Sequence, residues 1–277
     1  ACATAPREIL EKFACCAMPC ANTWRCVRSG RKESPQLETE TAILRFANLT
    51  FRGLHREDLL RENEDLKLIV TVNAEIIQAA NRNPELAAII NRNWSTLDGQ
   101  WPYVLAKRQS GRKDIEKISG SDFVYERCVM AAARGLRVFL LGADASVNET
   151  ACSRLRQDVG VAIEGYAPPL MSFPFPHDAD AAIMERVAEF SPRILVLAFG
   201  APKHEFWADA HLDELKALGI RWVIGAGGTL DFIAGTLRRA PLLLQRAGLE
   251  WLWRLALQPR LRFRRLLRAA QFIRYIK

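Results

Sequence analysis

Residues 193–228, RILVLAFGAPKHEFWADAHLDELKALGIRWVIGAGG, decide the fold class of this 277-residue chain. The apolar runs at 193–202 and 221–228 each predict a buried strand, and 204–219 between them predicts an amphipathic helix. Strands that are apolar on both faces and alternate with helices favour a parallel sheet covered by helices on both sides. This unit therefore predicts an α/β fold.

Strand-like and helix-like segments also alternate in the chain before this unit. Expected strands lie at 42–51, 66–72, 137–143 and 161–166. Expected helices lie at 55–63, 73–83, 84–93, 121–135, 147–159 and 178–190, and LDGQW at 97–101 is expected to be a loop. Ser121 or Asp122 is expected to cap the helix that begins there. The predicted fold class is α/β, with a Rossmann-like, mostly parallel sheet and helices on both faces.

Charge and cysteine content divide the chain into three parts. Residues 237–277 hold ten Arg, one Lys and one acid, so this segment carries +10, while the residues before it carry −2. We expect an α/β core at 41–236 and a helical, Arg-rich appendage at 237–277. Residues 1–40 hold five of the seven cysteines in a spacing that matches no common zinc site, and are expected to be a poorly ordered leader.

The appendage has the composition of a helix that lies on a membrane surface. If residues 262–276 are helical, Phe263, Leu267 and Ile273 fall on one face and Arg side chains largely on another. No apolar run of the chain approaches the roughly 20 residues that span a bilayer. A peripheral contact with an anionic membrane surface is expected. The alternative is that the apolar stripe packs on the body or on a second subunit of a homo-oligomer.

Small and polar residues follow several of the expected strands. They form the stretches 71–75, 140–144, 198–205 and 225–232. Ligands of parallel α/β sheets bind beyond the carboxyl ends of the strands, and helix starts there can hold phosphate on backbone N–H groups. No stretch completes the G-x-G-x-x-G fingerprint, which disfavours a nicotinamide-dependent oxidoreductase. The negative body disfavours a nucleic-acid-binding protein.

Eight short motifs occur in one order along the chain. They are TxNAE (71–75), LDG (97–99), GSD (120–122), FLLG (139–142), FGAPKHE (199–205), GAGGTLDFxAG (225–235), RRAP (238–241) and GLEWLWRL with QPR (248–260). In this order they resemble the WecG/TagA/CpsF glycosyltransferases, glycosyltransferase family 26. The resemblance runs from about Thr41 to Arg265.

The resemblance implies an inverting glycosyltransferase with a GT-E-like fold. Such an enzyme moves a sugar from a UDP-sugar donor to a polyprenyl-diphosphate-linked saccharide, as a peripheral protein on the cytoplasmic face of the cell membrane. The products are bacterial exopolysaccharide, capsule or cell-wall polymers. Catalysis without a metal or other cofactor is implied. Asp178-Ala179-Asp180 has the spelling of a metal-binding motif, but its place at an expected helix start favours capping.

The resemblance also implies roles for single residues. Asp98 occupies the position of the proposed catalytic base, with Thr71 and Asn73 beside it, although Asp98-Gly99 alone could be a plain turn. The residues expected to bind the UDP-sugar are Gly142, Gly200, Lys203, His204, Glu205, Gly225, Gly227, Gly228 and Asp231. The arginines expected to bind the phosphates of the leaving UDP are Arg239, Arg254, Arg260 and Arg264. His204 replaces the Gln of the family's PKQE motif, and a solvent-facing His is the alternative to a substrate contact.

Overall fold

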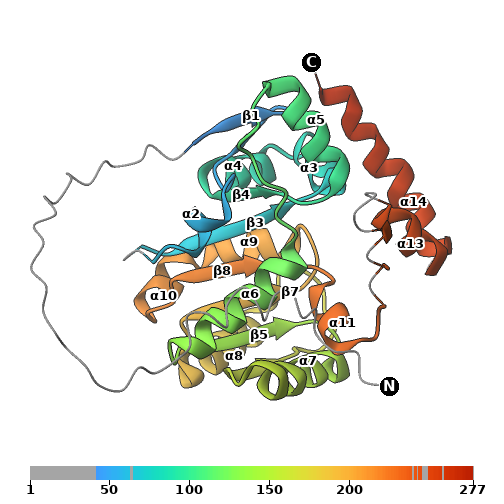
Figure 1. The fold of residues 1–277 in the computed structure, drawn as a ribbon. Helices are drawn as coiled ribbons and strands as arrows, with labels where there is room; N and C mark the ends of the chain where they lie inside the picture. The colour runs from blue at the N-terminus through green and yellow to red at the C-terminus, as the bar shows by residue number, and fades with distance from the viewer. Residues whose placement is uncertain are drawn as a thin grey trace, which may run out of the picture. The chain divides into compact units, whose positions relative to one another are not determined.

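The computed structural model (Figure 1) describes residues 42–62, 65–238, 240–241, 243–244, 249–257 and 259–276. The expected leader at 1–40 lies outside the described residues. So do Arg239 and the side chains of Arg254, Arg260 and Arg264. The strands are β1 Leu44–Phe46, β2 Leu49–Phe51, β3 Lys67–Val72, β4 Trp94–Leu97, β5 Arg137–Gly142, β6 Ala162–Tyr166, β7 Ile194–Ala198 and β8 Trp222–Gly225. The helices before β7 are α2 Arg56–Leu60, α3 Ala74–Ala80, α4 Pro84–Arg92, α5 Gln100–Ser110, α6 Gly120–Ala133, α7 Ala145–Val159 and α8 His177–Phe190. The helices after β7 are α9 Lys203–Ala210, α10 Leu212–Ala217, α11 Thr229–Ala234, α13 Glu250–Leu257, α14 Pro259–Ala270 and the 3-10 helix η2 Gln271–Tyr275.

The main sheet in the described residues has six strands in the order β4-β3-β8-β7-β5-β6, and every neighbouring pair is parallel. Successive residues of its central strands face opposite layers: Val70 and Leu195 pack into one core, and Ile69 and Val196 pack into the other. Helices α3, α4, α8, α9 and α10 contribute to the first core, and α2, α6, α7 and α11 to the second. The expected parallel sheet with helices on both faces is confirmed.

The order of the strands also marks where a ligand is expected to bind. The chain moves outward from β3 to β4 on one side of the sheet and from β5 to β6 on the other, and β7 and β8 fill the space between. At such a change of direction the connections leave a crevice at the carboxyl ends of the strands. The ends of β3 and β8, which pair directly, lie at this crevice.

Residues 42–51 form a hairpin and not the single strand that the sequence predicts. Strands β1 and β2 pair antiparallel, and Ala47 and Asn48 between them have φ angles of 50° and 62°. Such left-handed angles at both central residues are typical of a two-residue hairpin turn. The side chain of Asn81 holds this turn, because its Nδ2 donates to the Ala47 carbonyl at 3.0 Å and its Oδ1 accepts from Asn48 Nδ2 at 2.9 Å.

The prediction of a loop at 97–101 is also wrong. Strand β4 ends there, and α5 starts one residue after Gly99, whose φ of 99° suits only glycine. The sequence obscured β4 because Ser95 and Thr96 are polar yet fully buried. Ser95 Oγ donates to the Thr50 carbonyl at 2.9 Å and Thr96 Oγ1 to the Ile118 carbonyl at 3.4 Å, so both hydroxyls find partners inside the protein.

Two helix boundaries differ from expectation as well. The expected helix at 204–219 is divided at His211 into α9 and α10. Helix α6 starts at Gly120 with Ser119 at its N-cap position, and neither Ser121 nor Asp122 caps it, because both lie inside its first turn. The start of α6 is therefore set two residues earlier than the capping pattern suggests.

The end of the chain is helical, as expected, and its expected apolar stripe is exposed. Phe263, Leu267 and Ile273 are each more than half exposed, so they do not pack on the body of the chain, which was one of the two alternatives. Phe272 is instead buried in the first core, and Arg82 donates to Gln271 at 2.8 Å, which fixes η2 to the end of α3. In the described part of the chain, no helix is both long enough and apolar enough to cross a membrane.

Candidate active site

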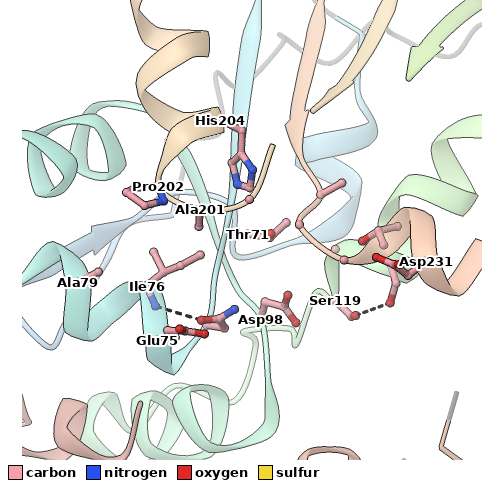
Figure 2. A pocket seen from close by; sticks show the side chains of 18 of the residues that line it. Thr71, Glu75, Ile76, Ala79, Asp98, Ser119, Ala201, Pro202, His204 and Asp231 are labelled. Atoms are coloured by element: carbon pink, nitrogen blue, oxygen red, sulfur yellow. Dashed lines mark hydrogen bonds between the residues drawn. The ribbon is translucent and has the colours of Figure 1, made fainter. Parts of the chain in front are cut away.

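A pocket of about 540 Å³ opens at the carboxyl ends of the central strands. Figure 2 shows Asp98 between Glu75 and Ser119 on one side of this pocket and His204 on the other. The lining comes from the segments that follow β3, β4, β7 and β8, from the start of α6, and from Arg268 of α14. Parts of the chain that are far apart in sequence therefore share one site.

Asp98 enters the pocket because β4 pairs in register with β3. Val72 lies opposite Leu97, so Asn73 and Asp98 follow at the same edge, and the Asp98 N–H donates to the Val72 carbonyl at 3.0 Å. Asn73 caps α3, since its Oδ1 accepts from the Ile76 N–H at 3.0 Å. Asp98 and Gly99 do form a turn between β4 and α5, as the alternative interpretation held. This turn also places Asp98 in the pocket lining, so the two interpretations do not exclude each other.

Thr71 connects the neighbouring strands β3 and β8 at the pocket. It is buried, lines the pocket, and its Oγ1 donates to the Gly225 carbonyl at 3.0 Å. Gly120 approaches the same side chain so closely that an added Cβ would lie 3.2 Å from Thr71 Cγ2. The absence of a side chain at Gly120 therefore lets α6 begin at the pocket wall.

His204 and Glu205 form a buried pair on the opposite wall. His204 is 3% exposed and Glu205 2%, and His204 Nε2 lies 3.0 Å from Glu205 Oε1. The solvent-facing alternative for His204 is wrong, because its ring lines the pocket. His204 Nδ1 has no hydrogen-bond partner among the described residues, and the Glu205 oxygens have no well-aligned one. A buried polar atom without a partner costs about 1–3 kcal/mol, so this wall of the pocket holds a destabilised polar pair.

Two of the expected binding glycines serve packing and do not line the pocket. A Cβ added to Gly225 would lie 2.9 Å from His204 Cδ2, so Gly225 makes room for the imidazole. A Cβ added to Gly142 would lie 2.9 Å from the Ala198 carbonyl carbon, so Gly142 allows β5 and β7 to end close together. Lys203 and Glu205 also lie outside the pocket lining.

The remaining expected residues of the UDP-sugar set do line the pocket: Gly200, Gly227, Gly228 and Asp231. Asp231 lies in the first turn of α11, and its Oδ1 accepts from Thr236 Oγ1 at 3.3 Å. Gly200 and Gly227 have φ angles of 85° and 39°, and nothing approaches within 4 Å of an added Cβ at either position. Backbone is therefore accessible from the pocket at these two positions.

The structure adds three features that the sequence interpretation did not assign to the site. Glu75 of the TxNAE motif faces the pocket beside Asp98 (Figure 2). The first residues of the 14-residue helix α6 also line the pocket, and Ser119 Oγ lies 3.0 Å from Ser121 Oγ. The third feature is Arg268, which the sequence suggested only as part of a charged helix face. Motif membership could have indicated Glu75 and Ser121, but no sequence signal distinguished Arg268 from its neighbours.

Asp180 has two partners within the protein. Its Oδ1 accepts from Trp207 Nε1 at 2.6 Å, and its Oδ2 lies 2.9 Å from His211 Nε2. The expected capping is only partly correct, because Asp178 and Asp180 lie in the first turn of α8 while Pro176 occupies the N-cap position. Within the described residues, no three His, Cys, Asp or Glu side chains are grouped so that they could hold a metal ion.

The fold and the pocket define an α/β protein whose ligand site lies at the carboxyl edge of a parallel sheet. The chain belongs to the glycosyl transferase WecG/TagA/CpsF family, whose family model matches residues 41–276. The family assigns a glycosyltransferase role to the chain, and with it a sugar donor and an acceptor as substrates. It gives no support to the oxidoreductase or nucleic-acid-binding alternatives.

Proposed function

We propose that this chain is an inverting transferase that moves a sugar from a UDP-sugar to a polyprenyl-diphosphate-linked saccharide. The observation that carries the proposal is the position of Asp98, on the turn after β4 and inside the pocket of a glycosyltransferase of this family. The enzyme would act as a peripheral protein on the cytoplasmic face of the cell membrane, in the biosynthesis of a bacterial envelope or extracellular polysaccharide.

Asp98 acts as the general base in this proposal. Its carboxylate takes the proton of the acceptor hydroxyl while that oxygen attacks the anomeric carbon of the donor. The new carbon–oxygen bond forms on the face opposite the UDP, and the bond to the diphosphate oxygen breaks with its electron pair leaving on UDP. Asn73 and Thr71 support this geometry, because Asn73 fixes the start of α3 beside Asp98 and Thr71 ties β3 to β8.

The leaving diphosphate needs positive charge that the carboxylates of the pocket do not provide. Glu75, Asp98 and Asp231 all line the pocket, so the diphosphate is expected near the start of α6 and near Arg268. The start of a long helix carries a partial positive charge and favours phosphate, and an Arg can bind it with two hydrogen bonds. Arg239, Arg254, Arg260 and Arg264 remain proposed partners on the same appendage. No metal ion is required in this scheme.

His204 is proposed to contact a hydroxyl or the base of the donor. Its Nε2 faces Glu205, so its Nδ1 is the ring nitrogen left to pair with a ligand. Gly200, Gly227 and Gly228 would let the donor approach the backbone closely. Gly142, Gly225, Lys203 and Glu205 would then support the site from behind its lining.

The proposal is tested by measuring UDP release with a panel of UDP-sugars and a short-chain polyprenyl-diphosphate saccharide. We expect release with one donor or a small group of donors, undiminished in a metal chelator, and a product with inverted anomeric configuration by NMR. Absence of transfer with every UDP-sugar, while another nucleotide-sugar supports it, would refute the donor class. Retention of configuration would refute the direct displacement by an acceptor that Asp98 activates.

A further inference from the structure

Helix α5 has an apolar and basic face that lacks cover from the described part of the chain. Trp101 is 55% exposed and Val104 39% exposed, and Arg108 is exposed as well. These positions are spaced i, i+3 and i+7, so they lie on one face of the helix. Pro102 and Ala106 on the other face are buried. Helix α5 is therefore fixed to the body by one side and presents a large aromatic ring to the solvent on the other.

The charges around this face are mostly positive. The segment from α5 to Lys117 holds five basic residues and two acids. Both acids already have cationic neighbours: Asp114 pairs with Arg112, and Glu116 lies 3.8 Å from Arg56. Arg108 is exposed on this face, and Lys113 is exposed in the segment that follows α5. A partner that fits this surface must accept aromatic and aliphatic side chains and carry negative charge, which is the chemistry of an anionic bilayer.

The position of α5 relative to the pocket favours the same partner. The helix starts at Gln100, two residues after Asp98, which lines the pocket, so Trp101 follows the pocket residue Asp98 by three positions. In Figure 1, α5 and α14 both lie toward the upper right of the molecule. Helix α14 carries the exposed side chains Phe263 and Leu267. Both α5 and α14 thus expose apolar side chains, so one kind of apolar partner fits both elements.

We propose that α5 is a second membrane-contacting element, which inserts Trp101 and Val104 at the headgroup level while Arg108 and Lys113 bind lipid phosphates. This inference rests on the proposed function in that the acceptor is held in the same bilayer. If only the appendage contacted the membrane, the α/β core could still tilt relative to the membrane surface. A second contact beside Asp98 sets the mouth of the pocket at the level of the headgroups, where the diphosphate of a lipid-linked acceptor lies.

The inference is tested by sedimentation of the 277-residue chain with phosphatidylglycerol-containing vesicles and with pure phosphatidylcholine vesicles, in the absence of substrates. We expect the Trp101→Ser, Val104→Ser double variant to bind anionic vesicles about tenfold more weakly. Arg108→Gln should bind anionic vesicles about fivefold more weakly than the unmodified chain. This difference in affinity should become smaller at high salt, which screens the charge of Arg108. The matched control is Leu170→Ser, because Leu170 is fully exposed in the loop between β6 and α8 and not on α5. Binding of the control should equal that of the unmodified chain.

A companion variant separates α5 from the appendage. The Phe263→Ser, Leu267→Ser double variant should also bind anionic vesicles more weakly. When these substitutions are combined with the α5 substitutions, the fold-loss of vesicle affinity should equal the product of the two separate fold-losses. Unchanged vesicle binding by the α5 double variant would overturn the inference. A change in its oligomeric state by light scattering, with vesicle binding intact, would overturn it in favour of contact with a second copy. Equal losses in the Leu170→Ser control would also overturn it.

The result of the vesicle-binding experiment does not depend on the proposed reaction. Vesicle binding requires neither donor nor acceptor, so loss of binding in the α5 variants supports the surface even if no UDP-sugar is turned over. If the enzyme does use UDP-sugars, the α5 variants should bind UDP normally by calorimetry. They should lose transfer to an acceptor embedded in vesicles and keep transfer to a short-chain acceptor in solution. Equal loss with both acceptors would contradict a role confined to the membrane.

Discussion

Asn73 and Asp98 each follow the last residue of neighbouring parallel strands, one position beyond the pair formed by Val72 and Leu97. Their side chains thus enter one pocket from two different connections, the one between β3 and α3 and the one between β4 and α5. Asn73 begins α3 by capping it, and Asp98 stands in the turn before α5. In the proposed mechanism Asp98 acts as the base, while Asn73 holds the adjoining helix in place.

We expect Asp98→Asn to fold normally and to bind UDP, but to lose transfer by about 10²–10⁴-fold, because an amide cannot accept the proton of the acceptor hydroxyl. Steady-state kinetics and UDP calorimetry check this prediction. Asp213→Asn serves as the control, since Asp213 lies in the first turn of α10 and outside the pocket. Turnover by Asp98→Asn within a few-fold of normal would exclude Asp98 as the base.

Gly225→Ala is expected to lower kcat/KM about tenfold or more, because the new methyl group would lie 2.9 Å from His204 Cδ2 and must displace the ring. A double-mutant cycle isolates this clash. In the His204→Ala background the same Gly225→Ala change should have little further effect, since the ring is no longer present. Additive losses in the cycle would mean that Gly225 acts through something other than His204.

Arg268→Ala should reduce kcat/KM for transfer by roughly 10–100-fold, because it removes a cation that lines the pocket and that the proposed mechanism places beside the leaving diphosphate. Arg274→Ala is the matched control, as Arg274 is exposed on η2 and not part of the pocket lining. Pre-steady-state measurement of UDP formation distinguishes a slower chemical step from weaker donor binding. Equal effects of the two substitutions would indicate only a general loss of basic charge.

The buried thiols of the core should be inert in the folded protein. Burial raises the pKa of Cys128 to about 12 and that of Cys152 to about 11, against an ordinary value of 9.0. Because the thiolate is the reactive form, only about one Cys128 side chain in ten thousand is ionised at pH 8. Peptide mass spectrometry after iodoacetamide treatment should find both residues unmodified in the native state and modified in guanidinium. Rapid native-state labelling of Cys128 would contradict its burial.

Prediction of the fold from the sequence succeeded where one physical signal dominated. Residues 194–198 are apolar on both faces, which is the pattern of a central parallel strand, and the structure has β7 there. Residues 66–72 are apolar except for Lys67 and Thr71, and the structure has β3 there. It failed at β4, whose buried Ser95 and Thr96 look like loop residues until their carbonyl partners on other segments are known. It failed again at 42–51, where the side chain of Asn81 supports the hairpin turn.

Some residues of the candidate site could likewise be predicted from the sequence, and others could not. The order of the motifs indicates Asp98, Thr71, Asn73 and His204, and the expected strand ends indicate the carboxyl edge of the sheet. It did not indicate that Gly225 faces the His204 ring, because that contact joins two segments only through the pairing of β7 with β8. Nor did it indicate Arg268, which follows Asp98 by 170 positions in the chain and reaches the pocket through the packing of α14 on α3.

The sequence by itself determined the α/β class, the basic appendage and the family, because periodicity, net charge and motif order are properties of the chain read locally. The tertiary structure decided which of the marked residues share one pocket, which glycines serve packing, and which apolar side chains are left exposed. These outcomes depend on strand register and helix packing between distant segments, and local sequence patterns do not encode the distances that result.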